Sequence, residues 1–145
     1  VKQDKGLIVF ASSPGSMHYC MGPSYGAHKA AVDKMAFDMG VDFADAGANV
    51  AAVSVWMGSL TTERLLSMME AMPELREKLE GTLESGGYTG HVAWAMINDP
   101  DMMAKFNGKT VIGAEVGKAG GRFPPSVRET TGAEPPRYFP YKVKM

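Results

Sequence analysis

The sequence has few of the features that mark a secreted, disulfide-linked or metal-binding protein. Its 145 residues include one cysteine, Cys20, so the chain cannot form an internal disulfide. A lone thiol suits a reducing compartment, and we expect a cytoplasmic protein. We interpret Cys20 as a partly buried loop thiol. No cluster of Cys and His has the spacing of metal ligands, so we predict no metal.

The chain also has almost no net charge and no long apolar runs. The formal net charge is -1 at pH 7 and the sequence pI is about 6.3. This balance disfavours a surface for nucleic acid or for anionic membranes. The longest apolar runs are far shorter than a membrane span requires. A chain of this length has room for one domain, and we expect neither a nucleic-acid partner nor a membrane span.

What the chain does contain is a hydroxyl pair, Ser12-Ser13, followed by Tyr25 and Lys29 where a helix is predicted to begin. Positions i and i+4 share one helix face, so the phenol and the ammonium can point into one site. An ammonium beside a phenol favours the phenolate and eases proton exchange near neutrality. A serine hydroxyl can hydrogen-bond a carbonyl or alcohol oxygen. The set predicts carbonyl/alcohol redox chemistry with a bound nicotinamide.

Apolar periodicity and breaker residues predict alternating strands and helices. The predicted strands are residues 7–11, 49–56 and 109–115, and the predicted helices are 24–46, 62–71, one starting at Pro73, and 88–98. Gly47 is a plausible C-cap of the first helix. Alternation of this kind indicates parallel strands joined by crossover helices. We read the glycines at 113, 117, 120 and 121 as a terminal turn region, and residues 122–145 as a Pro-rich, irregular tail.

Three separated segments, 6–13, 25–31 and 53–63, resemble the short-chain dehydrogenase/reductase family and occur in the family's order. The Ser-Ser-Pro-Gly turn and Trp56 before Gly58 resemble one branch of it in particular. The resemblance implies NAD(P)-dependent oxidation of an alcohol or reduction of a carbonyl, with NAD or NADP as the cofactor. Tyr25 would be the acid/base, and Lys29 would bind the nicotinamide ribose.

One serine of the pair would orient the substrate oxygen, and two alignments compete. Aligning the strand end places Ser13 at the family position, whereas counting back from Tyr25 favours Ser12. We favour Ser13, because the short Pro14-Gly15 turn suggests a one-residue deletion in the loop. Successive strand residues face opposite sides, so the two serines cannot do the same job.

The resemblance also implies cofactor contacts after the second predicted strand. Met57-Gly58 stands where the family usually has Pro-Gly. Gly58 would let the backbone pass close to the nicotinamide, and backbone N–H groups including that of Leu60 would meet the carboxamide. Thr62 would bond the carboxamide or a phosphate; an equally good interpretation makes it a helix cap.

The family's glycine-rich nucleotide turn is absent near the start of the sequence. We therefore expect residues 1–121 to be the second half of a doubly wound, Rossmann-like domain, with three parallel strands and the first half missing. Its substrate would be a small carbonyl or alcohol, and the twelve Met residues favour a lipophilic one. The resemblance makes pairing of subunits through the Tyr25 helix plausible. The alternative is a truncated, inactive fragment that acts at most as an oligomerisation or partner-binding module.

Overall fold

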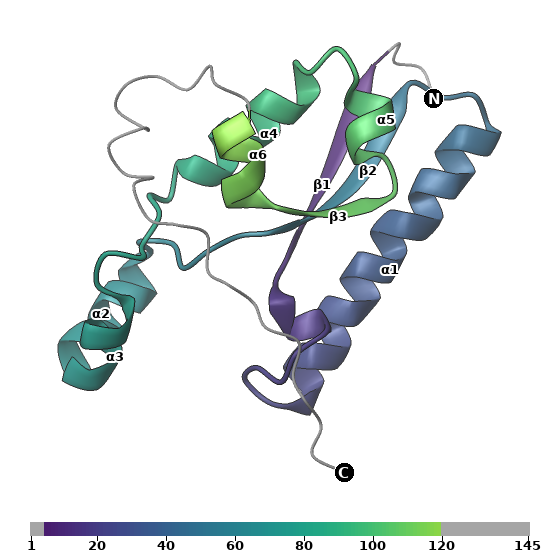
Figure 1. Cartoon of the computed structure of the whole chain (residues 1–145). Helices are drawn as coiled ribbons and strands as arrows, with labels where there is room; N and C mark the ends of the chain where they lie inside the picture. Colours follow the sequence, from purple (N-terminus) through teal and green to yellow (C-terminus); the bar gives the residue numbers. More distant parts are fainter. Residues whose placement is uncertain (1–4, 120–145) are drawn as a thin grey trace.

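The computed structural model describes residues 5–119, and these form three parallel strands with helices on both faces of the sheet (Figure 1). The strands are β1 (Gly6–Ser12), β2 (Val50–Trp56) and β3 (Lys109–Ile112), in the order β1-β2-β3. This arrangement confirms the predicted α/β class and the parallel pairing. The predicted ends of the first two strands are correct to within one residue.

Strand β2 is the centre of the structure. Its residues Ala51, Ala52 and Val53 are fully buried, because β2 has a neighbouring strand on each side and a helix layer on each face. Side chains alternate along it. Ser54 and Trp56 face the long helix α1, whereas Val53 and Val55 face the helices on the other side of the sheet.

Helix α1 (Pro23–Asp45) lies along one face of the sheet (Figure 1). The side of the helix that faces the sheet is apolar: Ala36 is buried and Met39 is half-buried. The helix ends in a Schellman arrangement, as its Gly47 predicted. Gly47 has φ +61° and donates to Ala44 O, and the next N–H donates to Phe43 O.

The second half of α1 touches the chain just before β3. A Cβ placed on Gly40 would lie 2.3 Å from the Cα of Gly108, so only hydrogen fits between the two backbones. Asn107 completes the contact, because its Nδ2 donates to Gly40 O and its Oδ1 accepts from the N–H of Ala52. These contacts fix α1 against β2 at the end of the helix that lies away from Tyr25.

The other face of the sheet carries helix α4 (Tyr88–Ile97), which we predicted as 88–98. Its buried side chains pack on those of β2 and form the main core cluster, which consists of Val53, Val55, Tyr88, Val92 and Met96. A short helix, α5 (Met102–Phe106), connects α4 to β3 and was absent from our sequence interpretation.

The predicted strand 109–115 is too long. Strand β3 ends at Ile112, which pairs with Trp56, the last residue of β2, and helix α6 (Gly113–Ala119) begins at once. The turn interpretation of Gly113 and Gly117 is wrong as well. A Cβ on Gly117 would lie 1.9 Å from the Tyr88 hydroxyl, and one on Gly113 would lie 2.6 Å from Met57 Sδ, so both glycines allow close packing within a helix. The remaining glycines of that cluster and the tail 122–145 lie outside the described residues.

Between β2 and α4 the chain makes an excursion that contains α2 (Glu63–Ala71) and α3 (Pro73–Leu79). The two helices pack on each other and project away from the sheet (Figure 1). Both were predicted, with starts within one residue. Within residues 5–119 no helix combines the length and the apolar character needed to cross a membrane.

We predict that Gly40→Ala destabilises the fold by about 2 kcal/mol, because the new methyl group would meet backbone atoms of Gly108 that cannot rotate away. Gly90→Ala is the matched control. Gly90 is an exposed residue of α4 with open space around its Cβ position, so alanine there should add about 1 kcal/mol of stability through helix propensity. Urea unfolding followed by circular dichroism measures both changes, and equal midpoints for the two variants would contradict the close contact.

Candidate active site

A hydroxyl cluster lies where β1 ends and α1 begins. The chain leaves β1 through Ser13 and the short 3-10 turn η1 (Pro14–Ser16), and α1 then brings Tyr25 back over that turn. The Tyr25 hydroxyl donates to Ser13 Oγ at 3.0 Å, and the Gly15 N–H donates to the same oxygen at 3.1 Å. Because Ser13 Oγ accepts two hydrogen bonds, its own O–H is left to donate to a third group.

The two serines of the pair point to different places. Ser12 is the last residue of β1, pairs with Trp56 and is buried, with its hydroxyl 3.4 Å from Lys29 O under helix α1. Ser13 follows the strand and turns toward the Tyr25 hydroxyl. The structure therefore brings Ser13, and not Ser12, together with Tyr25.

Lys29 lies one turn after Tyr25 on the same face of α1. Its ammonium is 5.5 Å from the centre of the Tyr25 ring and donates to Ala11 O at 3.1 Å. That bond uses one of its three protons, so two remain for other acceptors. Gly15 makes the arrangement compact, because a Cβ there would lie 2.7 Å from Cε1 of the Tyr25 ring.

The loop after β2 is held by a residue that sequence reasoning missed, Glu84. Its backbone pairs with Leu60 in an isolated parallel bridge, with Thr61 N donating to Glu84 O and Glu84 N donating to Ser59 O, both at 2.9 Å. Its carboxylate accepts from Gly58 N at 3.3 Å. No motif marks Glu84 in the sequence, since its partners are backbone groups more than twenty residues away.

Thr62 caps helix α2. Its Oγ1 accepts from Leu65 N at 3.3 Å, so the cap interpretation of this residue is confirmed. The cap uses the oxygen as an acceptor and leaves the hydroxyl proton available to a further acceptor. Thr62 can therefore serve as a cap and still donate a hydrogen bond.

Glu84 is a buried carboxyl without a cation partner among the described ion pairs. Burial raises the pKa of Glu84 above its ordinary value of 4.5, and the hydrogen bond from Gly58 N opposes this rise. Nearby Tyr88 is buried too. Desolvation, helped by the charge of Glu84, raises the pKa of Tyr88 to about 12, so this phenol stays protonated at neutral pH.

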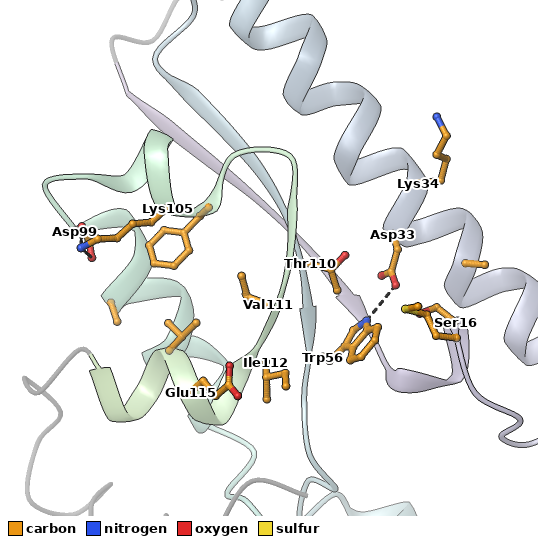
Figure 2. A pocket seen from close by; sticks show the side chains of 15 residues that line it. Ser16, Asp33, Lys34, Trp56, Asp99, Lys105, Thr110, Val111, Ile112 and Glu115 are labelled. Carbon is orange, nitrogen blue, oxygen red and sulfur yellow. Dashed lines mark hydrogen bonds and ion pairs between the residues drawn. The ribbon is translucent and has the colours of Figure 1, made fainter. Parts of the chain in front are cut away.

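A cavity of about 920 Å³ opens between α1 and β3, with Ser16 of the turn η1 on its wall (Figure 2). Trp56, Phe106 and Val111 are among its apolar walls, and Met17 reaches it from the loop before α1. Ser13, Tyr25 and Lys29 do not line it. We place the candidate acid–base site at the hydroxyl cluster rather than in this cavity, because the polar groups converge there.

The loop between η1 and α1 is unusually apolar for an exposed segment. Met17, Tyr19 and Met21 are 75%, 77% and 79% exposed. Cys20, which we expected to be partly buried, is exposed like its neighbours in this loop. Within residues 5–119 no group of three or more His, Cys, Asp or Glu side chains has a metal-binding arrangement.

Comparison with known proteins finds relatives in the family that the sequence motifs resemble. The chain is 32% identical over 111 residues to human dehydrogenase/reductase SDR family member 1, and 34% identical over 110 residues to the mouse protein of that name. The chain belongs to the short-chain dehydrogenase/reductase family. The branch that the Ser-Ser-Pro-Gly turn and Trp56 resemble is this member 1 branch, so both expectations are confirmed. No protein-family model matches the chain.

The matched region covers 72% and 71% of this chain but only 35% and 34% of the two relatives, so the chain spans about a third of the length of the curated relatives it matches. Solved structures of short-chain dehydrogenase/reductases share its fold. An oxidoreductase from Burkholderia thailandensis superposes with a TM-score of 0.60 at 17% identity and covers 73% of this chain and 42% of its own.

Two further solved structures are cofactor complexes. The angucycline C-6 ketoreductase LanV with bound NADP has a TM-score of 0.59 at 20% identity, covering 76% of this chain and 42% of LanV. A 3-oxoacyl-[acyl-carrier protein] reductase from Brucella melitensis in complex with NAD has a TM-score of 0.59 at 16% identity, covering 78% and 44%. These comparisons confirm the Rossmann-like fold, and two of the structures that share it hold NADP or NAD.

The raised pKa of Glu84 predicts how the stability of the folded protein depends on pH. Because the folded protein holds the Glu84 proton to higher pH than the unfolded chain does, the free energy of unfolding should fall as pH rises from about 4.5 through the folded pKa. Glu84→Gln removes this titration while keeping an oxygen that can accept from Gly58. The melting temperature of Glu84→Gln, relative to that of the wild type, should therefore increase as pH rises from 4 to 7.

The control is Glu77→Gln on the exposed side of α3, whose melting temperature should follow the wild-type pH profile. Thermal unfolding by circular dichroism at a series of pH values gives both curves. A Glu84→Gln curve that runs parallel to the wild type across this range would refute the buried-carboxyl assignment.

Proposed function

We propose that this chain is the catalytic part of a NAD(P)-dependent oxidoreductase that interconverts a carbonyl and an alcohol. The observation that carries the proposal is the hydrogen bond from the Tyr25 hydroxyl to Ser13 Oγ, with Lys29 on the same face of α1. In this assignment Tyr25 is the acid/base, Ser13 orients the substrate oxygen and Lys29 supports Tyr25 and the cofactor. Ser12, the alternative to Ser13, has a structural role beneath α1.

The hydrogen-bonding capacity of the cluster supports these roles. A carbonyl oxygen that approaches Tyr25 and Ser13 can accept from both hydroxyls, once the phenol turns from Ser13 Oγ toward the substrate. The phenol then gives its proton to the oxygen during reduction, or takes it back during oxidation. The Lys29 ammonium favours the phenolate that remains after proton donation.

The residues present suit a nicotinamide nucleotide. Lys29 Nζ has protons to offer a ribose hydroxyl, because its hydrogen bond to Ala11 O uses one of its three N–H groups. The loop with Gly58, Leu60 and Thr62 lies at the carboxyl end of β2, the edge at which open α/β sheets bind ligands. When bound, such a cofactor, NAD or NADP, supplies or accepts the hydride.

The substrate class that we propose is a small lipophilic carbonyl or secondary alcohol. Met17 and Met21, in the loop between the Ser13 turn and α1, are strongly exposed, and Met68 and Met72 of the α2–α3 excursion are about half exposed. Flexible thioether side chains adapt to apolar ligands of different shape. The single, exposed Cys20 supports a reducing compartment such as the cytoplasm.

The outer face of α1 supports pairing of subunits through this helix. Met35, Phe37 and Val41 are 46%, 54% and 45% exposed, and Phe37 and Val41, four residues apart, share one side of the helix. Such a face also fits the second candidate function, an inactive fragment that binds a partner. Saturable binding of NADH or NADPH by the folded chain, followed by fluorescence, favours the enzyme over the fragment.

We predict that Tyr25→Phe lowers carbonyl reduction by about 100-fold or more, because the proton donor is lost while the ring remains. Tyr19→Phe is the matched control: Tyr19 is 77% exposed in the nearby loop and should keep wild-type activity. Both variants are screened against a panel of aldehydes and ketones by the change in NADPH and NADH absorbance. Equal activities of the two variants would remove Tyr25 from the mechanism.

The serine pair gives a second test. Ser13→Ala should lower kcat by about 100-fold, because a donor to the substrate oxygen disappears. Ser12→Ala should stay within about threefold of wild-type kcat, since Ser12 faces Lys29 O beneath the helix. The measurement is steady-state kinetics on the best substrate of the panel. A larger fall in kcat for Ser12→Ala than for Ser13→Ala would assign the substrate contact to Ser12 instead.

A further inference from the structure

One turn beyond Lys29, the carboxylate of Asp33 joins helix α1 to strand β2. Its Oδ1 accepts from Ser54 Oγ at 2.5 Å and its Oδ2 accepts from Trp56 Nε1 at 3.1 Å, as the dashed line in Figure 2 marks for the indole. Both partners are neutral. Among the ion pairs of residues 5–119 none includes Asp33, and the neighbouring Lys34 pairs with Asp38 on the exposed side of the helix.

A half-buried carboxylate with two neutral donors and no cation is costly to desolvate, yet its hydrogen bonds are strongly directional. The two donors are residues i and i+2 on one face of β2, so the bonds fix both the position of α1 along the strand and its rotation about its axis. A merely solvated surface acid would impose neither constraint.

The hydrogen bonds of Asp33 join two elements, α1 and β2, and on each of them they lie close to the candidate site. On α1, Lys29 and Tyr25 lie four and eight residues before Asp33, on the same helix face. On β2, Trp56 is the last strand residue, two positions before Gly58. Other side-chain hydrogen bonds near this end of α1 are those from Tyr25 to Ser13 Oγ at 3.0 Å and from Lys29 to Ala11 O at 3.1 Å. The contact from Ser12 Oγ to Lys29 O, at 3.4 Å, is long for a hydroxyl donor.

We propose that Asp33 is a positioning residue for the Tyr25/Lys29 pair: its carboxylate holds the acid–base helix in register with the loop that begins after Trp56. The inference rests on the proposed function for its catalytic consequence, while the placement of Tyr25 by Asp33 is open to direct measurement. Asp33 itself touches neither Tyr25 nor the reacting atoms and transfers no proton.

Two substitutions separate the geometry from the charge. Asp33→Ala removes both hydrogen bonds. Asp33→Asn keeps the shape and loses the charge: the amide oxygen can accept from Trp56 Nε1, and the amide NH₂ can donate to Ser54 Oγ, because a hydroxyl accepts as well as donates. Asp38→Ala is the control, since it deletes a carboxylate from the exposed side of the same helix, where Asp38 is 54% exposed.

The first readout needs no activity. In protein labelled with ¹³Cζ-tyrosine, the Tyr25 resonance is assigned with the Tyr25→Phe variant and compared at a temperature where circular dichroism shows every variant folded. We expect it to move in Asp33→Ala and to stay at or near its wild-type position in Asp33→Asn and Asp38→Ala. A Tyr25 resonance unchanged in Asp33→Ala overturns the proposal, and so does one that moves equally in all three variants.

The second readout is kinetic. We expect kcat to fall by about 10- to 100-fold in Asp33→Ala with KM changed much less, and to recover in Asp33→Asn, because misplacement of a proton donor slows the chemical step. A loss that Asp33→Asn does not recover overturns the geometric role in favour of charge. If the wild-type chain neither binds NADH or NADPH nor turns over a substrate, the proposed function fails for this chain, and the Tyr25 resonance alone decides the role of Asp33.

Discussion

The parallel register of β1 and β2 is the constraint on which the rest of the structure depends. Pairing runs without a break from Gly6 opposite Val50 to Ser12 opposite Trp56, so both strands end at the same level. The loops that leave them, one through Ser13 and the other through Gly58, must then emerge side by side at one edge of the sheet. After a slip of one residue, Ser12 and Trp56 could no longer both face α1, and one of their two contacts with that helix would be lost.

Much of this arrangement could be predicted because it follows local rules. The apolar runs of β1 and β2 have no competing helical period, and the long helix has a clear start near Pro23 and a glycine at its end. The choice between Ser12 and Ser13 was open in the sequence, since two alignments disagreed by one residue. Strand alternation separates them in space, because the last residue of β1 must face the helix layer.

What could not be predicted depends on partners far away in the chain. Gly113 and Gly117 suggest a turn locally, yet they lie in a helix because Met57 and the Tyr88 hydroxyl occupy the space that side chains would need. Glu84 and Asp33 belong to the same class. Their partners are backbone groups of one loop and side chains of a distant strand, so neither residue has a spacing that a motif could describe.

The α2–α3 excursion leaves and rejoins the body at one point, the bridge between Leu60 and Glu84. Its interior contributes little to the core, since the two helices contact chiefly each other. For a closed loop of this kind, the entropy of closure grows only with the logarithm of length, by about 0.6 kcal/mol for each doubling. Evolution can therefore lengthen, shorten or replace the segment between the two ends of the bridge at small cost to the sheet. The bridge between Leu60 and Glu84 therefore separates the sheet and its packed helices, whose sequence pattern must be kept, from a segment whose sequence is free to diverge.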